Sequence, residues 1–118
     1  MILSSKVRMT DEIRQRQTEV FDAIHRGATC RFLYCITMPS CENNLLDIHP
    51  YREIYNRKEY DSPYWILGLA ENRQGAVELV FEMAKEAAAV TTCPEDYEKN
   101  FRMLRDACLV ADGANRKE

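Results

Sequence analysis

The feature that most constrains the fold is the stretch from Gly75 to Val90, because its apolar residues recur at the spacing of one helix face. Most of its residues are strong helix formers, and Asn72 can cap the helix by accepting a hydrogen bond from a first-turn amide. We therefore predict a long, well-buried helix here. Its apolar stripe consists of Ala76, Val80, Met83, Ala84 and Ala87, and it is widened by Val77, Phe81 and Ala88.

A line of acidic residues runs along the remaining face of this helix. Glu78, Glu82 and Glu86 lie four residues apart, so they stack one turn above another. Like charges at this spacing repel and cost a few tenths of a kcal/mol per pair. Glu86 also lies near the negative end of the helix dipole. The line is either a solvated face or an acidic contact surface, and the sequence allows both interpretations.

Length and composition predict one domain over residues 1–118, with loose ends at 1–9 and 114–118, or a short first strand within 1–9. A hydrophobic content of 46% is too high for a disordered chain. No apolar run reaches the ~18 residues that span a bilayer, and the first residues lack the apolar core of a signal peptide. We therefore expect a cytoplasmic protein without membrane contact. Five cysteines at irregular spacing indicate reduced thiols.

Local patterns predict the remaining elements. A helix over 11–26 begins with a Thr10 cap and ends at Gly27. Strands are expected over 30–38 and 45–58, with Pro50 marking an edge, a bulge or a break, and a turn follows at 60–63. Residues 64–70 form the clearest strand, apolar on both faces and therefore central. A capping box at 92–95 opens a last helix that Gly113 ends.

Together these elements predict an α+β fold. An N-terminal helix precedes a three-stranded antiparallel meander, and two C-terminal helices follow it. We expect the sheet and the helices to pack as two layers, with one face of the sheet partly exposed.

The net charge of −3 is concentrated in one segment. Residues 71–98 contain seven acidic and two basic residues, a net charge of −5, and the rest of the chain is neutral or basic. Such a balance argues against general nucleic-acid binding and for a partner with a basic surface.

The candidate catalytic and metal-binding sets are weak. Cys30, Cys35, Cys41 and His49 lack the close pairs typical of zinc sites. A Cys41–His49 pair has no third group to orient it, and the four glycines form no phosphate-binding loop. We therefore expect no metal, no cofactor and no enzymatic activity.

An aromatic and basic segment offers an alternative surface. Tyrosines interleaved with cations can stack bases and hold phosphates, but neighbouring carboxylates cancel the charge locally. The same residue types are also enriched in protein interfaces. The segment contains Tyr51, Arg52, Tyr55, Arg57 and Lys58, followed by Tyr60, Tyr64 and Trp65.

The order of a strand at Trp65–Ala70, then Glu71 and Asn72, then a glutamate-lined helix resembles small phage-encoded inhibitors of CRISPR nucleases. The resemblance covers about a third of the chain and lies in layout and charge. It implies a small acidic inhibitor that occupies the basic nucleic-acid groove of a nuclease.

We therefore expect a non-enzymatic binding protein with a basic protein partner. The alternative is a nucleic-acid-binding regulatory protein that uses the aromatic and basic segment. The sequence leaves the oligomeric state open. The candidate partner-binding residues are Glu71, Glu78, Glu82, Glu86, Glu95 and Asp96, together with Tyr51, Arg52, Tyr55 and Arg57.

Overall fold

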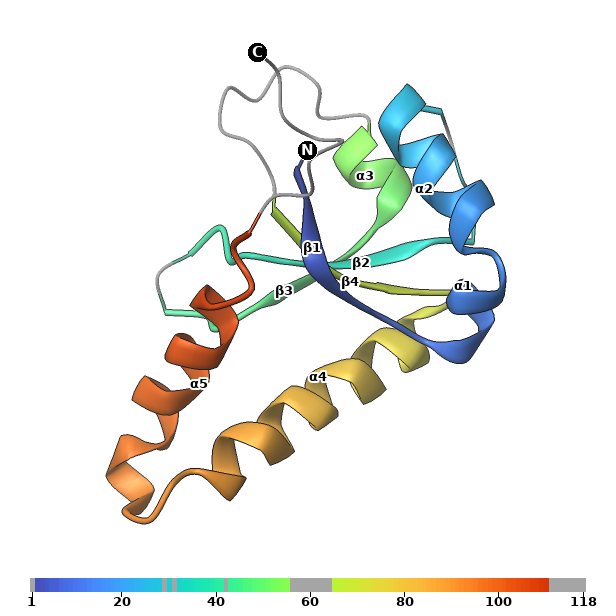
Figure 1. Ribbon diagram of the computed structural model, residues 1–118. Helices are drawn as coiled ribbons and strands as arrows, with labels where there is room; N and C mark the ends of the chain where they lie inside the picture. The colour runs from blue at the N-terminus through green and yellow to red at the C-terminus, as the bar shows by residue number, and fades with distance from the viewer. Residues whose placement is uncertain (1, 29, 31, 42, 56–64, 111–118) are drawn as a thin grey trace.

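A computed structural model describes residues 2–28, 30, 32–41, 43–55 and 65–110 (Figure 1). The described chain has an α+β fold, as predicted. The strands are β1 (Ile2–Met9), β2 (Tyr34–Thr37), β3 (Asp47–Pro50) and β4 (Trp65–Ala70). The helices are α1 (Asp11–Gln15), α2 (Gln17–Arg26), α3 (Tyr51–Tyr55), α4 (Arg73–Ala89), a 3-10 turn (Pro94–Asp96) and α5 (Tyr97–Asp106).

The sheet has four strands in the order β1-β4-β2-β3, so the prediction of a three-stranded antiparallel meander is wrong. Strands β2 and β3 form an antiparallel pair, and β2 also runs antiparallel to β4. The first segment, expected to be a loose arm or a short strand, is the strand β1, which pairs with β4 in parallel and places Ile2 beside Trp65. Strand β4 is central as predicted, because its apolar residues are buried on both faces.

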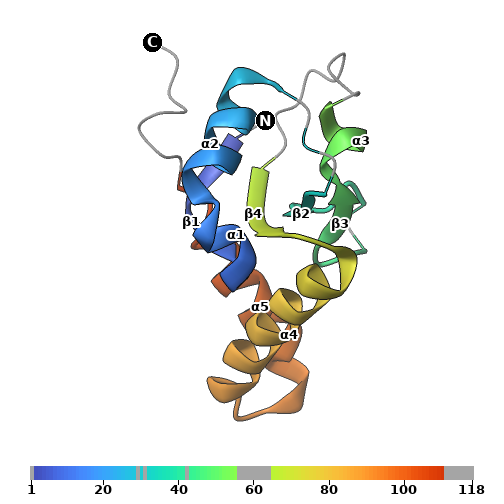
Figure 2. The ribbon, with the colours of Figure 1, turned by 90° about the vertical axis from the view of Figure 1, so that its right-hand side faces the viewer.

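Helices cover both faces of the sheet, so the predicted two-layer packing is also wrong (Figure 2). The neighbours Cys35 and Ile36 point to opposite faces, and both are fully buried. Cys35 belongs to a core shared with α1, α2 and α3, which includes Ile13, Val20 and Ile54. Ile36 belongs to a second core beneath α4.

The predicted helix over 11–26 is present but interrupted at Arg16, which separates α1 from α2. Thr10 caps the first part by accepting a hydrogen bond from the Ile13 amide at 3.4 Å. Gly27 ends the second part with a φ of 69°, the left-handed conformation that glycine adopts without strain. Both predicted ends of this segment are therefore confirmed.

The second extended segment predicted over 45–58 breaks at Pro50, one of the alternatives predicted for this proline, and α3 replaces the strand directly after it. Tyr51 is fully buried, and its hydroxyl donates to the Ala28 carbonyl at 2.9 Å. Burial of this large aromatic side chain stabilises the change from strand to helix at this point. Residues 56–58 and the predicted turn at 60–63 lie outside the described residues.

Helix α4 begins as predicted, with the Asn72 side chain accepting from the Gly75 amide at 2.7 Å. The capping box predicted for the last helix is wrong. Residues Pro94–Asp96 form a 3-10 turn instead, and the Glu95 carboxylate accepts from the Cys93 thiol at 3.1 Å. Helix α5 follows and ends at Asp106, before Gly113, which lies outside the described part.

Helices α4 and α5 form a hairpin, residues 73–106, that packs on itself through Met83, Ala87 and Phe101. In both views it forms one end of the molecule and extends away from the sheet (Figures 1 and 2). No helix within the described residues has the length and apolar character needed to cross a bilayer.

Candidate partner-binding surface

The acidic line of α4 has two available carboxylates in the structure, where the sequence predicted three. Glu78 and Glu82 are exposed, and neither forms an ion pair among the residues that the structure describes. Glu86 instead binds Arg8 of β1 through two hydrogen bonds, each of 2.6 Å. Glu86 is therefore engaged with the protein itself and is not available to a partner in this conformation.

The Arg8–Glu86 ion pair changes the titration of both groups. The hydrogen bonds from Arg8 hold the pKa of Glu86 below its ordinary value, and those to Glu86 raise the pKa of Arg8. This ion pair connects α4 to the edge strand of the sheet. It also offsets the unfavourable position of a carboxylate near the helix C-terminus.

The other acidic candidates occupy two different places. Glu71 is half-buried between β4 and α4, where its carboxylate accepts a hydrogen bond from the Thr10 hydroxyl at 2.6 Å. Glu95 and Asp96 are exposed in the turn at the far end of the hairpin. Of these three residues, only Glu95 and Asp96 therefore extend the exposed negative charge of Glu78 and Glu82 along the α4–α5 hairpin.

The aromatic and basic candidates do not form one surface within the described residues. Tyr51 is in the core, whereas Arg52 is exposed on α3. The side chain of Tyr55 and residue Arg57 lie outside the part that the structure describes. The structure therefore removes Tyr51 from the candidate contact residues in this conformation.

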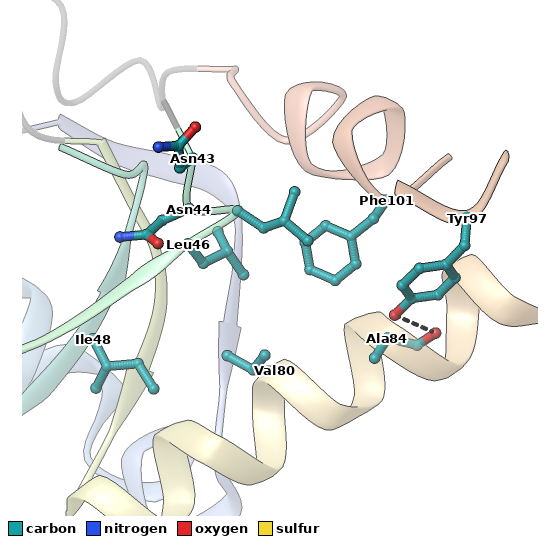
Figure 3. Close-up of a pocket in the computed structure, with 9 residues that line it drawn as sticks. Asn43, Asn44, Leu46, Ile48, Val80, Ala84, Tyr97 and Phe101 are labelled. Carbon is teal, nitrogen blue, oxygen red and sulfur yellow. Dashed lines mark hydrogen bonds between the residues drawn. The ribbon is translucent and has the colours of Figure 1, made fainter. Parts of the chain in front are cut away.

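An apolar groove lies between the α4–α5 hairpin and the start of β3, and sequence reasoning missed it (Figure 3). Its volume is about 380 Å³. The Arg105 side chain is buried and donates to the Leu45 carbonyl at 2.9 Å, which fixes the loop that forms one wall. The groove is lined by Asn43, Asn44, Leu45, Leu46, Ile48, Val80, Ala84, Tyr97 and Phe101.

A large apolar side chain lies exposed on the same helix as the groove. Phe81 of α4 is 62% exposed, although Val80 beside it lines the groove. The sequence contained a signal for this arrangement, because Val77, Phe81 and Ala88 widen the apolar stripe beyond the width that one contact covers. Helix α4 therefore presents more apolar surface than the sheet and α5 bury.

A polar cluster also lies on β3, where His49 is between two carboxylates. His49 is 3.6 Å from Asp47 and 3.7 Å from Glu53. Burial disfavours the charged form of Asp47, but hydrogen bonds from the Ser40 amide and hydroxyl, together with the neighbouring His49, outweigh burial and lower its pKa. Among the described residues, no three histidine, cysteine or acidic side chains lie close enough to share a metal ion.

The cysteines weighed as candidates for zinc binding and thiol catalysis are separated in the structure. Cys35 is buried in the core that α1, α2 and α3 cover, where burial raises the pKa of its thiol, whereas Cys41 is exposed in the loop before β3.

No family of known proteins, no curated protein and no solved structure matches this chain.

Proposed function

We propose that this chain is a small non-enzymatic binding protein that contacts a basic partner through the exposed acidic side of α4. The observation that carries this proposal is the pair Glu78 and Glu82, exposed one turn apart without ion pairs among the described residues. Their repulsion costs stability, and no ion pair within the described residues offsets it, although Arg8 attracts Glu82 over a longer distance. A basic partner would supply the missing compensation.

The spacing of these charges supports a more specific form of the proposal. Carboxylates four residues apart on a helix repeat every ~6 Å, on the order of the spacing of backbone phosphates. Glu95 and Asp96 add charge at the far end of the same hairpin. The chain would then act as an inhibitor that occupies the nucleic-acid groove of a partner such as a CRISPR nuclease, as the resemblance implies.

The alternative function, direct nucleic-acid binding through the aromatic and basic segment, has less support. Base stacking needs an accessible aromatic face, and Tyr51 is fully buried. Arg52 alone remains exposed among the candidates whose side chains the structure describes. We therefore keep the acidic surface as the proposed function.

The test is the substitution Glu82→Lys, with Glu19→Lys as the matched control. Glu19 is exposed on α2, which packs on the opposite face of the sheet, so its reversal changes the net charge equally. The parent chain, immobilised, should retain a basic protein from a host lysate at low salt and release it at high salt. Glu82→Lys should lose the partner, mainly through slower association, while Glu19→Lys retains it.

Thermal melting of the same variants separates binding from folding. Glu82→Lys should melt at the parent temperature or slightly above it, because the introduced lysine can pair with Glu78 one turn earlier. A partner whose binding does not depend on salt, or that binds Glu82→Lys as well as the parent, would show that the acidic side of α4 is not the contact surface.

A further inference from the structure

Helix α4 carries two apolar stripes: one is buried, and the other is covered only in part, because Val77 and Ala84 are half-buried and Ala84 packs against the α4–α5 core. The covered stripe packs on the sheet and on α5 through Ala76, Leu79, Met83 and Ala87. The second stripe consists of Val77, Phe81, Ala84 and Ala88, with successive spacings of 4, 3 and 4 residues. That spacing is the seam of a two-helix coiled coil. Phe81 at its centre is 62% exposed, and Ala88 is also exposed.

We propose that this seam binds a second copy of the chain, with the two α4 helices packed antiparallel. A two-fold contact brings the same surface of both copies together, so each residue is used twice. When the seam centres coincide, Phe81 of one copy lies opposite Ala84 of the other, and Val77 lies opposite Ala88. Each large side chain therefore meets a small one.

The groove gives the Phe81 ring a place to bind. Ala84 and Val80 belong both to the seam side of α4 and to the wall of the groove of about 380 Å³ (Figure 3). A phenylalanine placed opposite Ala84 points its ring at this opening. In the dimer, Phe81 of each copy therefore binds the groove of the other copy, so the two-fold axis produces this contact twice.

The charges beside the seam favour a second copy over an unrelated helix. One flank of the seam is apolar and is covered by the protein itself, because Val80 packs toward the sheet and Ala87 is buried against α5. The other flank holds Glu78 and Lys85, both exposed. In an antiparallel pair, equivalent flanks face each other, so Glu78 of each copy meets Lys85 of the other. A parallel pair would set both charged residues against the apolar flank, so the antiparallel arrangement is selected.

This contact uses Glu78, which the proposed partner surface also uses, but it does not use Glu82. Glu82 lies about 100° around the helix from Phe81 and about 160° from Ala84, so it faces away from the seam. A dimer therefore leaves Glu82 accessible. Glu82→Lys tests the partner surface without changing the seam, and the variants below test the seam without changing Glu82.

The seam spans twelve residues from Val77 to Ala88, about 16 Å of helix, so the dimer should be weak and concentration-dependent. Sedimentation equilibrium of the parent at low salt, from about 10 μM to 1 mM, should show a rise toward twice the mass of one chain. Phe81→Ser should weaken association by about 10- to 100-fold. Met103→Ser is the matched control, because Met103 is 61% exposed on α5, away from the groove, and its loss should change nothing.

A charge exchange tests the antiparallel register directly. Glu78→Lys puts lysine against Lys85 in both pairs, and Lys85→Glu puts glutamate against Glu78, so each variant alone should be monomeric. An equimolar mixture restores two opposite-charge pairs and should form a one-to-one dimer. Circular dichroism of each variant confirms that α4 is intact. A monomeric parent at every concentration, self-association of either charge variant equal to the parent, or an inert mixture would overturn the proposal.

Discussion

The ion pair between Arg8 and Glu86 offers the sharpest test of the structure. Glu86→Gln keeps the size of the side chain but removes its charge and thus the bidentate pair. The Arg8 side chain is 25% exposed and that of Glu86 48%, so solvent screens much of the attraction. We therefore expect a loss of about 1 kcal/mol in the free energy of unfolding, the upper end for exposed pairs, and a melting temperature lower by about 3–5 °C.

Glu82→Gln is the matched control, one turn earlier on the same helix. Glu82 forms no ion pair within the described residues; it repels Glu78 and Glu86, and Arg8 attracts it only over a longer distance. Its neutralisation should leave stability unchanged or raise it by a few tenths of a kcal/mol. The two variants differ by one position in the acidic line, yet only Glu86→Gln should lower the melting temperature.

The difference between the parent and Glu86→Gln should also depend on pH. Arg8 lowers the pKa of Glu86 in the folded state, from an ordinary value of 4.5. The stabilisation is therefore complete above pH 4.5 and is lost as the pH falls through the lowered folded-state pKa. Urea unfolding followed by circular dichroism, at about pH 7 and about pH 2, measures this. Equal stability of Glu86→Gln and Glu82→Gln at neutral pH, or a difference that persists in acid, would refute the reasoning.

Two further predictions concern the sheet. Gly68→Ala should lower the free energy of unfolding by about 1–3 kcal/mol, because the new Cβ would lie 2.7 Å from Cδ1 and 3.2 Å from Cβ of Ile36. Adding Ile36→Val should recover part of this loss, as measured by urea unfolding. Strictly additive losses in the two variants would contradict this contact. Cys35 should resist a thiol reagent in the folded protein while Cys41 reacts rapidly, because burial raises the pKa of the Cys35 thiol; early modification of Cys35, read by mass spectrometry, would contradict its placement.

Sequence reasoning succeeded where the signal is local. The caps at Thr10, Gly27 and Asn72 involve residues within five positions of each other, so cap chemistry alone places these helix ends. The central strand was also predictable, because a run that is apolar on both faces needs cover from both sides.

The pairing of β1 could not be predicted because its causes lie far away in the chain. Its middle is polar, and the register with β4 is irregular between Leu3 and Arg8. Ser4 is nevertheless buried, because its hydroxyl donates to the Cys108 carbonyl at 2.5 Å. Local patterns therefore left a loose arm and a short strand as alternatives, and they do not reveal which strand β1 pairs with.

The candidate surface was predictable only in part for the same reason. The spacing of the glutamates placed Glu78 and Glu82 on an exposed side of α4, but the ion pair of Glu86 joins residues 78 positions apart. The groove needs the loop at Leu45 to lie against α5, a contact that residue spacing does not encode. Local periodicity thus identified the helix, and tertiary packing decided which of its residues a partner can reach.

The strand order has a consequence for how this chain is made. β4 lies between β1 and β2, yet it is the last of these strands to leave the ribosome. Until it emerges, β2 and β3 can pair as neighbours, but β1 has no partner, and its pairing must wait until Trp65 reaches Ile2. A nascent chain halted before β4 therefore carries unpaired strand edges and an uncovered apolar core. Such a halted chain would be a substrate for chaperones and proteases, so complete synthesis of β4 decides whether the product survives.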